Sequence, residues 1–230
     1  MIFGSNNLIN RQKWVEKTLK AIPTNKKIID VGAGECQYKI YCHHLDYTSQ
    51  DFNQYSGVGN GVGYQTGEWD VSQIDIVSDI LEIPVDDNSF EVVLCTEVLE
   101  HVPNPIAAIE EMSRILNENG QIILTAPFCS LTHFAPYHYC DGFSKYFYEY
   151  HLERLGFKDI QIIPNGNYYQ YIAQEMERLP TMFKMFSNKS SLLLKIISRI
   201  MIKVLQYYNN RSSNTESMLC FGYHVKATKT

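Results

Sequence analysis

Short apolar runs, bounded by glycine, proline or acidic turns, recur along most of the chain, and segments of helical periodicity separate them. The run at residues 90–95 is apolar almost throughout, which suits a parallel strand covered on both faces. Strands that alternate with helices in this way predict an α/β fold around one open sheet. The strands predicted from these runs are residues 28–31, 47–50, 74–80, 90–95, 121–126, 158–163 and 218–227.

Three helices are marked by apolar faces and by the residues that end them. The first covers residues 11–22 and stops at a proline. The second starts after Asn104, which suits an N-cap, and Gly120 ends it. The third begins near Ser144 and ends at Gly156. The side chains that repeat at helical spacing are Trp14, Val15, Leu19 and Ile22 in the first, Ile106, Ile109, Met112 and Leu116 in the second, and Phe147, Tyr148, His151, Leu152 and Leu155 in the third.

The turn between the first two strands has the residues of a nucleotide-binding loop. Gly32 and Gly34 follow the first strand directly, before a presumed helix and a second strand that leads to Asp51. The glycines let the chain turn sharply and let a ligand approach the backbone, because no Cβ stands in the way. A carboxylate at the end of the neighbouring strand can accept both hydroxyls of a ribose. This stretch therefore predicts a site for an adenosine-containing cofactor.

Details of the same turn argue against a dinucleotide. Pyrophosphate binding needs a third glycine three residues after Gly34, and Gln37 stands there instead. Asp30, just before the turn, would repel a pyrophosphate but suits the positive end of a cationic cofactor. A nucleotide-binding oxidoreductase on the same fold stays as a second hypothesis. A cofactor-binding partner protein without catalysis is the third.

The pattern D-x-G-x-G, with an acid at the second strand, resembles that of class I S-adenosylmethionine-dependent methyltransferases of the methyltransferase type 11-like group. The acid after the third strand, the T-E-V-L-E-H after the fourth and the block L-N-E-N-G-Q-I-I-L-T-A-P follow in that family's order, so the resemblance covers residues 28–163. It implies a Rossmann-like, seven-stranded, mostly parallel sheet with helices on both faces and an antiparallel last strand. It also implies S-adenosylmethionine as the cofactor, held by Asp30, Gly32, Ala33, Gly34, Asp51, Phe52, Asp79, Ile80, Thr96 and Glu97.

Residues 130–156 resemble a subgroup of that family found in bacterial surface-polysaccharide gene clusters. The expected acceptor is a hydroxyl of a small molecule or a glycan, and its proton calls for a base such as an imidazole. We expect His133 and His138 to be catalytic, ahead of His101, although each also fits an ordinary place at the pocket rim. Tyr137 and Tyr139 are expected to bind the acceptor, since aromatic rings stack on sugar faces.

Glu97, Glu100 and His101 form an E-x-x-E-H motif that resembles the magnesium-binding set of ubiquinone-pathway and small-RNA O-methyltransferases. Two carboxylates and an imidazole at one helix start suit a divalent cation. The same motif occurs widely in the superfamily without a metal, so we expect none here.

The composition is that of a globular protein, with 45% of the 230 residues hydrophobic and 20% charged. We expect a single methyltransferase domain, with residues 28–163 as the cofactor-binding core, 168–215 as a helical insertion and 218–227 as the last strand. The six cysteines form no paired pattern and the N-terminus has no signal-peptide pattern, which favours the cytoplasm. A net charge of −5 disfavours nucleic acid as a partner.

Charge is distributed unevenly along the chain. Residues 178–215 contain seven basic residues and no acidic one, so the rest carries 13 basic against 25 acidic residues. Within this segment, residues 189–207 predict a helix on which Lys195, Arg199 and Lys203 repeat every four residues. One interpretation is a helix buried against the domain or against a second subunit of a homodimer. The other is a helix that lies on anionic lipid as a peripheral membrane contact.

Overall fold

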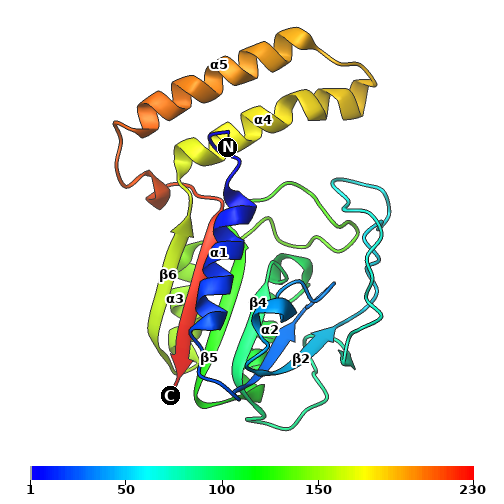
Figure 1. Ribbon diagram of the computed structural model, residues 1–230, viewed down its shortest axis with the longest axis vertical. Helices are drawn as coiled ribbons and strands as arrows, with labels where there is room; N and C mark the ends of the chain where they lie inside the picture. Colours follow the sequence, from blue (N-terminus) through cyan, green and yellow to red (C-terminus); the bar gives the residue numbers. More distant parts are fainter. Residues whose placement is uncertain (1) are drawn as a thin grey trace. The chain divides into compact units, whose positions relative to one another are not determined.

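The computed structural model describes residues 2–230, and its strands form one seven-stranded sheet in the order β3-β2-β1-β4-β5-β7-β6 (Figure 1). β1 pairs in parallel with β2 and β4, β2 with β3, and β4 with β5, whereas β7 runs antiparallel to β5. The predicted Rossmann-like fold with a mostly parallel sheet is confirmed. The strands are β1 (Lys27–Val31), β2 (Asp46–Asp51), β3 (Ile76–Val77), β4 (Phe90–Thr96), β5 (Leu116–Pro127), β6 (Phe157–Asn165) and β7 (Gly222–Lys229).

Helices cover both faces of the sheet. His224 of β7 stacks on Trp14 of α1, with ring centroids 4.8 Å apart. The preceding residue, Tyr223, packs against Tyr148 of α3. Successive side chains of a strand point to opposite faces, so α1 and α3 lie on opposite sides of β7. The helices are α1 (Asn7–Lys20), α2 (Pro105–Ile115), α3 (Lys145–Arg154), α4 (Tyr168–Ser187) and α5 (Leu192–Asn209).

The apolar face predicted for the first helix forms part of the core. Val15 and Leu19 are fully buried and belong to one cluster with Ile28, Leu94 and Ile123, which come from the three central strands β1, β4 and β5. The helix runs from Asn7 to Lys20 rather than over residues 11–22. Burial of this apolar stripe on the sheet fixes α1, as expected for an amphipathic helix.

Two compact units make up the chain. The larger comprises Lys13–Ile163 and Gly222–Thr230, and the smaller comprises Pro164–Phe221 with the N-terminal residues up to Gln12. In the smaller unit, α4 and α5 follow one another within the segment expected to be a helical insertion. The side chains of Asn167 and Ser191 cap them by accepting hydrogen bonds from backbone amides of the first turn. None of the described helices is long and apolar enough to span a bilayer.

Three local predictions were wrong. No α-helix follows the glycine turn in the described chain, because Gly32, Gly34 and Cys36 have φ values of 70°, 52° and 54°, and left-handed residues interrupt a right-handed helix. Between the glycine turn and β2 the structure has only a 3-10 turn, η1 (Lys39–Tyr41). Helix α2 ends at Ile115 and not at Gly120, because Leu116 already pairs with Phe90 of β4.

The third error concerns two strand lengths. β3 covers only Ile76–Val77, because only Gln50 and Asp51 of β2 pair with it. β7 begins at Gly222 rather than at residue 218.

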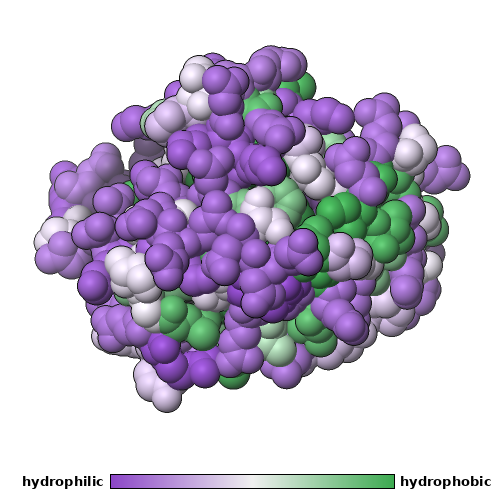
Figure 2. All heavy atoms as spheres, turned by 90° about the horizontal axis from the view of Figure 1, so that it is seen from below, coloured by the Kyte–Doolittle hydropathy of each residue, from purple (hydrophilic) through white to green (hydrophobic). Residues whose placement is uncertain are grey.

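Apolar side chains gather on parts of the surface. The face drawn in Figure 2 is largely hydrophilic, with separate apolar patches. On α5 only Ser198 and Ile202 are buried. Most of the apolar surface of α5 is therefore exposed. The exposed apolar face of α5 consists of Leu192, Leu193, Ile196, Ile197, Ile200, Met201, Val204, Tyr207 and Tyr208.

Candidate cofactor site

A cavity of about 480 Å³ opens where β1, β2 and β4 end. Ligands of open α/β sheets bind outside these carboxyl ends, and the volume is in the range of small-molecule sites. Eight of the residues predicted for cofactor or acceptor line the cavity: Gly32, Asp51, Phe52, Asp79, Ile80, Glu97, Tyr137 and Tyr139. The predicted residues that are not among its lining are Asp30, Ala33, Gly34, Thr96, His133 and His138.

The carboxylate of Asp51 is held by backbone amides. The Gly34 amide donates to its Oδ2 at 3.0 Å, and the Asn53 amide donates to its Oδ1 at 2.8 Å. Asp51 ends β2, and only 8% of it is exposed. Each carboxylate oxygen can accept more than one hydrogen bond, so both oxygens keep capacity for ligand hydroxyls. The glycine turn thus orients the acid that the sequence assigned to a ribose.

Gly32 is required by its surroundings. Its φ is 70°, and a Cβ at this position would lie 2.4 Å from a methyl group of Val98. Both Gly32 and Val98 line the cavity. A larger residue would therefore have both an unfavourable backbone and a steric clash at the cavity wall.

Asp30 lies behind the glycine turn, with 1% of it exposed. The Tyr47 hydroxyl donates to its Oδ2 at 2.8 Å. Burial raises the pKa of the Asp30 carboxyl to about 7, and the nearby Asp51 adds to the rise. Asp30 is thus a buried acid that is bonded to Tyr47 and does not line the cavity.

Asp79 caps a turn and also lines the cavity. Its Oδ1 accepts a hydrogen bond from the Leu81 amide at 2.9 Å, which caps the turn after β3. Asp79 and the next residue, Ile80, also line the cavity. Gln50, which the sequence did not single out, donates to the Ser78 carbonyl oxygen at 2.8 Å and ties β2 to this turn.

Glu97 follows β4 in a left-handed conformation, with φ of 55°. Non-glycine residues with positive φ are uncommon and often mark functional sites. The Thr125 hydroxyl donates to Glu97 Oε1 at 2.9 Å, and the Glu97 amide donates to the Thr125 carbonyl oxygen. These two bonds to β5 hold the carboxylate at the cavity.

An aromatic wall closes another side of the cavity. Tyr55 stacks on Phe134 with ring centroids 4.7 Å apart, and Trp69 packs edge-on against both rings. Phe52 lies edge-on to Tyr137 at 5.1 Å. The wall residues that sequence reasoning missed are Tyr55, Trp69 and Phe134.

Two long loops meet to form this wall. The Asn60 amide donates to the Ala135 carbonyl oxygen, and Tyr64 and the 132–134 segment exchange two further backbone hydrogen bonds. A Cβ on Gly59 would lie 2.2 Å from the Ala135 oxygen. The glycines of residues 57–67 therefore allow the close approach of two backbones. No periodicity in either loop indicates this pairing.

Three histidines gather beside the cavity. His101 lines the cavity and lies edge-on to His133, with ring centroids 4.6 Å apart. The ring centroids of His133 and His138 are 4.9 Å apart. Both Glu100 and His101 belong to the 3-10 turn η2 (Leu99–His101) after β4, and Glu100 is fully buried. Burial lowers the pKa of the His101 imidazole to about 3, and the neighbouring His133 adds to this effect. His101 is therefore neutral at physiological pH.

Comparison with known proteins agrees with this geometry. Residues 29–124 match the family model described as a methyltransferase domain. A SAM-dependent methyltransferase from Archaeoglobus fulgidus has a similar structure, with a TM-score of 0.59 and 16% identity over 98% of this chain and 95% of that one. The fold is that of the class I methyltransferases. Residues 29–124 are thus similar to a methyltransferase domain, and the chain shares its fold with a SAM-dependent methyltransferase.

Two curated proteins are related to parts of the chain. An uncharacterised protein of Methanocaldococcus jannaschii is 47% identical over 49 residues, 21% of each chain. The ubiquinone biosynthesis O-methyltransferase of Dechloromonas aromatica is 27% identical over 119 residues, which are 50% of this chain and 49% of that one. The chain thus matches about a fifth and about half of the lengths of these relatives.

Proposed function

We propose that the protein is an S-adenosylmethionine-dependent methyltransferase in which Asp51 binds the ribose of the cofactor. The observation that carries this proposal is the Asp51 carboxylate, oriented by two backbone amides beside a glycine turn in a cavity of suitable size. Asp79, Ile80 and Phe52 bind the adenine end, and Glu97 lies toward the methionine end. Gly32, Ala33 and Gly34 form the turn against the cofactor, with Asp30 and Thr96 behind it. We further propose that the chain acts as one domain, with residues 168–215 as an insertion.

For the acceptor we propose a hydroxyl of a small molecule or a glycan, bound between Tyr137 and Tyr139. Aromatic side chains stack on ring faces, and these two line the cavity. The resemblance of residues 130–156 supports a glycan from bacterial surface-polysaccharide synthesis in the cytoplasm. Methyl transfer breaks the bond between sulfur and methyl, forms the bond between oxygen and methyl, and releases the hydroxyl proton. His138 or His133, from the loop beside the cavity, takes this proton.

One observation favours a second function, a cofactor-binding protein without catalysis. His133 and His138 stand beside the cavity rather than among its lining residues. Such a protein would bind cofactor through the same Asp51 and would transfer no methyl group.

The first experiment is thermal unfolding with S-adenosylhomocysteine, compared with NAD and with buffer. Ligand at about 100 times its Kd adds about 2.7 kcal/mol, and each kcal/mol raises the midpoint by roughly 2–4 °C for a chain of this size. We expect a rise of roughly 5–10 °C with S-adenosylhomocysteine alone. Asp51→Ala should abolish the rise, whereas Asp86→Ala, at an exposed acid away from the cavity, should keep it. A rise with NAD alone would overturn the proposal in favour of a nucleotide-binding oxidoreductase.

We also propose that the exposed apolar face of α5 lies on an anionic membrane surface. Nine apolar side chains of this helix are exposed, and residues 178–215 carry seven basic and no acidic residues. Amphipathic helices with basic residues bind anionic lipid through both features. The homodimer contact expected as an alternative would cover the same face.

A further inference from the structure

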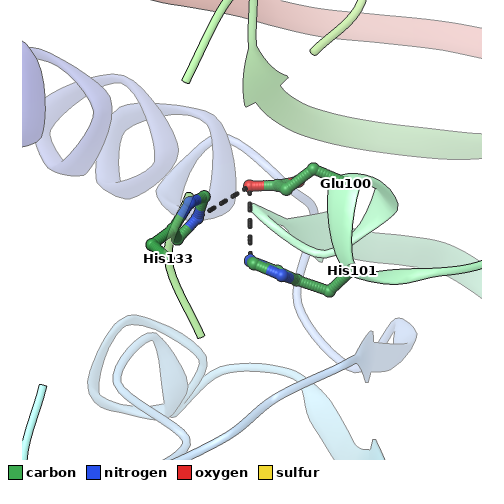
Figure 3. Close-up of side chains that lie close together, drawn as sticks. All are labelled: Glu100, His101 and His133. Atoms are coloured by element: carbon green, nitrogen blue, oxygen red, sulfur yellow. Dashed lines mark ion pairs between the residues drawn. The ribbon is translucent and has the colours of Figure 1, made fainter. Parts of the chain in front are cut away.

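We propose that Glu100, His101 and His133 bind a divalent transition-metal ion at the wall of the cavity. Figure 3 shows the three side chains directed toward one another, Glu100 and His101 from the turn after β4 and His133 from the loop after β5. Glu100 Oε1 lies 3.7 Å from His101 Nε2 and 3.9 Å from His133 Nε2. One ligand atom from each residue lies within 4.8 Å of the others.

Hydrogen bonds set which nitrogen of each imidazole faces the cluster. His101 Nδ1 contacts the Tyr137 carbonyl oxygen, and His133 Nδ1 contacts the Leu131 carbonyl oxygen at 2.8 Å. A carbonyl oxygen only accepts, so both Nδ1 atoms carry the hydrogen, and in the neutral imidazole Nε2 then carries a lone pair. Metal-binding histidines usually donate their other ring N–H to a carbonyl or carboxylate oxygen, which fixes the orientation of the ring.

The main chain of Glu100 joins the turn after β4 to the loop that carries His133. Glu100 is fully buried, and its carbonyl oxygen accepts hydrogen bonds from the Tyr139 and Cys140 amides, at 2.9 and 3.2 Å. These two bonds draw the loop after β5 onto η2, and the same loop carries His133. Three acceptor atoms, one from each residue, lie within 4.8 Å of one another, a spacing that suits one shared cation.

The ligand set selects the class of metal. Two imidazole nitrogens and one carboxylate oxygen suit zinc and its first-row neighbours, whereas magnesium and calcium prefer oxygen ligands throughout. Ligands about 2.0–2.2 Å from a tetrahedral ion lie about 3.3–3.5 Å apart. The observed separations are 3.7 and 3.9 Å from Glu100 to the two imidazoles and within 4.8 Å for all three pairs, so side-chain rotations must draw the ligand atoms together.

The structure therefore revises the magnesium motif considered from the sequence. Glu97, the first acid of that motif, is bonded by Thr125 instead, and the distant His133 supplies the third ligand atom. Three protein ligands leave one tetrahedral position for another molecule. Since His101 lines the cavity, this position gives an acceptor oxygen access to the ion. This acceptor role rests on the proposed function, whereas metal binding itself does not. With His133 on the metal, His138 is left as the base.

The test is a Co²⁺ titration of the purified, metal-stripped full chain, followed by visible absorption and by metal analysis after dialysis. We expect one Co²⁺ per chain, displaced by Zn²⁺ but not by Mg²⁺. His133→Ala and Glu100→Gln should weaken binding by about tenfold or more. His43→Ala, which removes an exposed histidine outside the cluster, should leave it unchanged.

S-adenosylhomocysteine binding is measured on the same samples, and it reports folding of the variants as well. His133 is partly exposed and outside the cavity lining, so His133→Ala should keep ligand binding while it loses the metal. Absence of Co²⁺ binding in a chain that binds S-adenosylhomocysteine would overturn the metal site alone. Displacement by Mg²⁺, or equal Co²⁺ affinity in His133→Ala, would overturn the proposed ligands. Co²⁺ binding without S-adenosylhomocysteine binding would support the metal site and count against the proposed function.

Discussion

Single residues set the geometry of the cofactor site. Asp51 is oriented by amides of Gly34 and Asn53, so its carboxylate is fixed before any ligand arrives. Preorganised acceptors of this kind bind hydroxyls with little further loss of side-chain freedom. Gly32 has no Cβ and can therefore lie close to Val98, which also lines the cavity.

The need for glycine at position 32 is testable with a matched control. Gly32→Ala places a Cβ at positive φ and 2.4 Å from Val98, whereas Gly61→Ala has a similar φ of 77° with nothing within 4 Å. Positive φ costs about 1–2 kcal/mol in either variant, and the clash should add about 1–3 kcal/mol to Gly32→Ala alone. Urea unfolding measures the difference. Equal losses in the two variants would contradict a steric role of Val98.

At the scale of elements, the ends of β1, β2 and β4 position the residues proposed to bind the cofactor. Helix α5 presents an exposed apolar surface. The apolar face of α5 is exposed on a segment without acidic residues. Its basic residues Lys195, Arg199 and Lys203 repeat every four positions along the helix. Both features belong to the helix as a whole and to no single side chain.

We therefore expect the protein to sediment with vesicles that contain phosphatidylserine, and to do so less as salt increases, since the attraction is screened. Neutral phosphatidylcholine vesicles should bind much less. Replacing Ile196 and Ile200 with serine should reduce binding, because both are exposed apolar residues of α5. The matched control is Val62→Ser, an exposed apolar residue of the glycine-rich loop. A chain that ignores anionic vesicles at low salt, and dimerises through α5 instead, would contradict the membrane proposal.

On the scale of the whole molecule, one buried acid makes the free energy of unfolding depend on pH. The pKa of Asp30 is raised from 3.8 to about 7, chiefly by burial. Between these values the folded chain holds a proton that the unfolded chain has lost, so the free energy of unfolding falls as pH rises from about 4 to about 7.

Asp30→Asn should remove this contribution while it keeps an acceptor for the Tyr47 hydroxyl. Relative to the variant, the original chain should lose up to about 4 kcal/mol between pH 4 and pH 8, since each pKa unit corresponds to about 1.4 kcal/mol. Urea unfolding at several pH values measures the difference. Parallel pH profiles for the two proteins would show that Asp30 titrates normally. The exposed Asp86→Asn should give such a parallel profile.

The sequence predicts best those features whose residues lie close together along the chain. Strand ends, the glycine turn and Asp51 lie within 24 consecutive residues whose pattern carries the information (28–51). The aromatic wall and the cluster of Glu100 with His133 depend on two long loops that meet through backbone hydrogen bonds. No periodicity encodes such a pairing, so Tyr55, Trp69 and the ligand role of His133 were out of reach. The α-helix expected after Gly34 was wrong because Gly34 and Cys36 are left-handed, and no pattern in residues 35–41 indicates that conformation at Cys36.

The two loops pair through their main chains, which leaves the side chains of the loop after β5 able to vary. Their backbones are joined by main-chain hydrogen bonds, as between Asn60 and Ala135, and the close approach depends on glycines of the first loop, as at Gly59. Side chains of the loop after β5 can therefore change during evolution while the wall keeps its position. Asp51 and Asp79, which we propose bind the cofactor, lie outside this loop, so a descendant of this protein can acquire a new acceptor without rebuilding the half of the site proposed for the methyl donor.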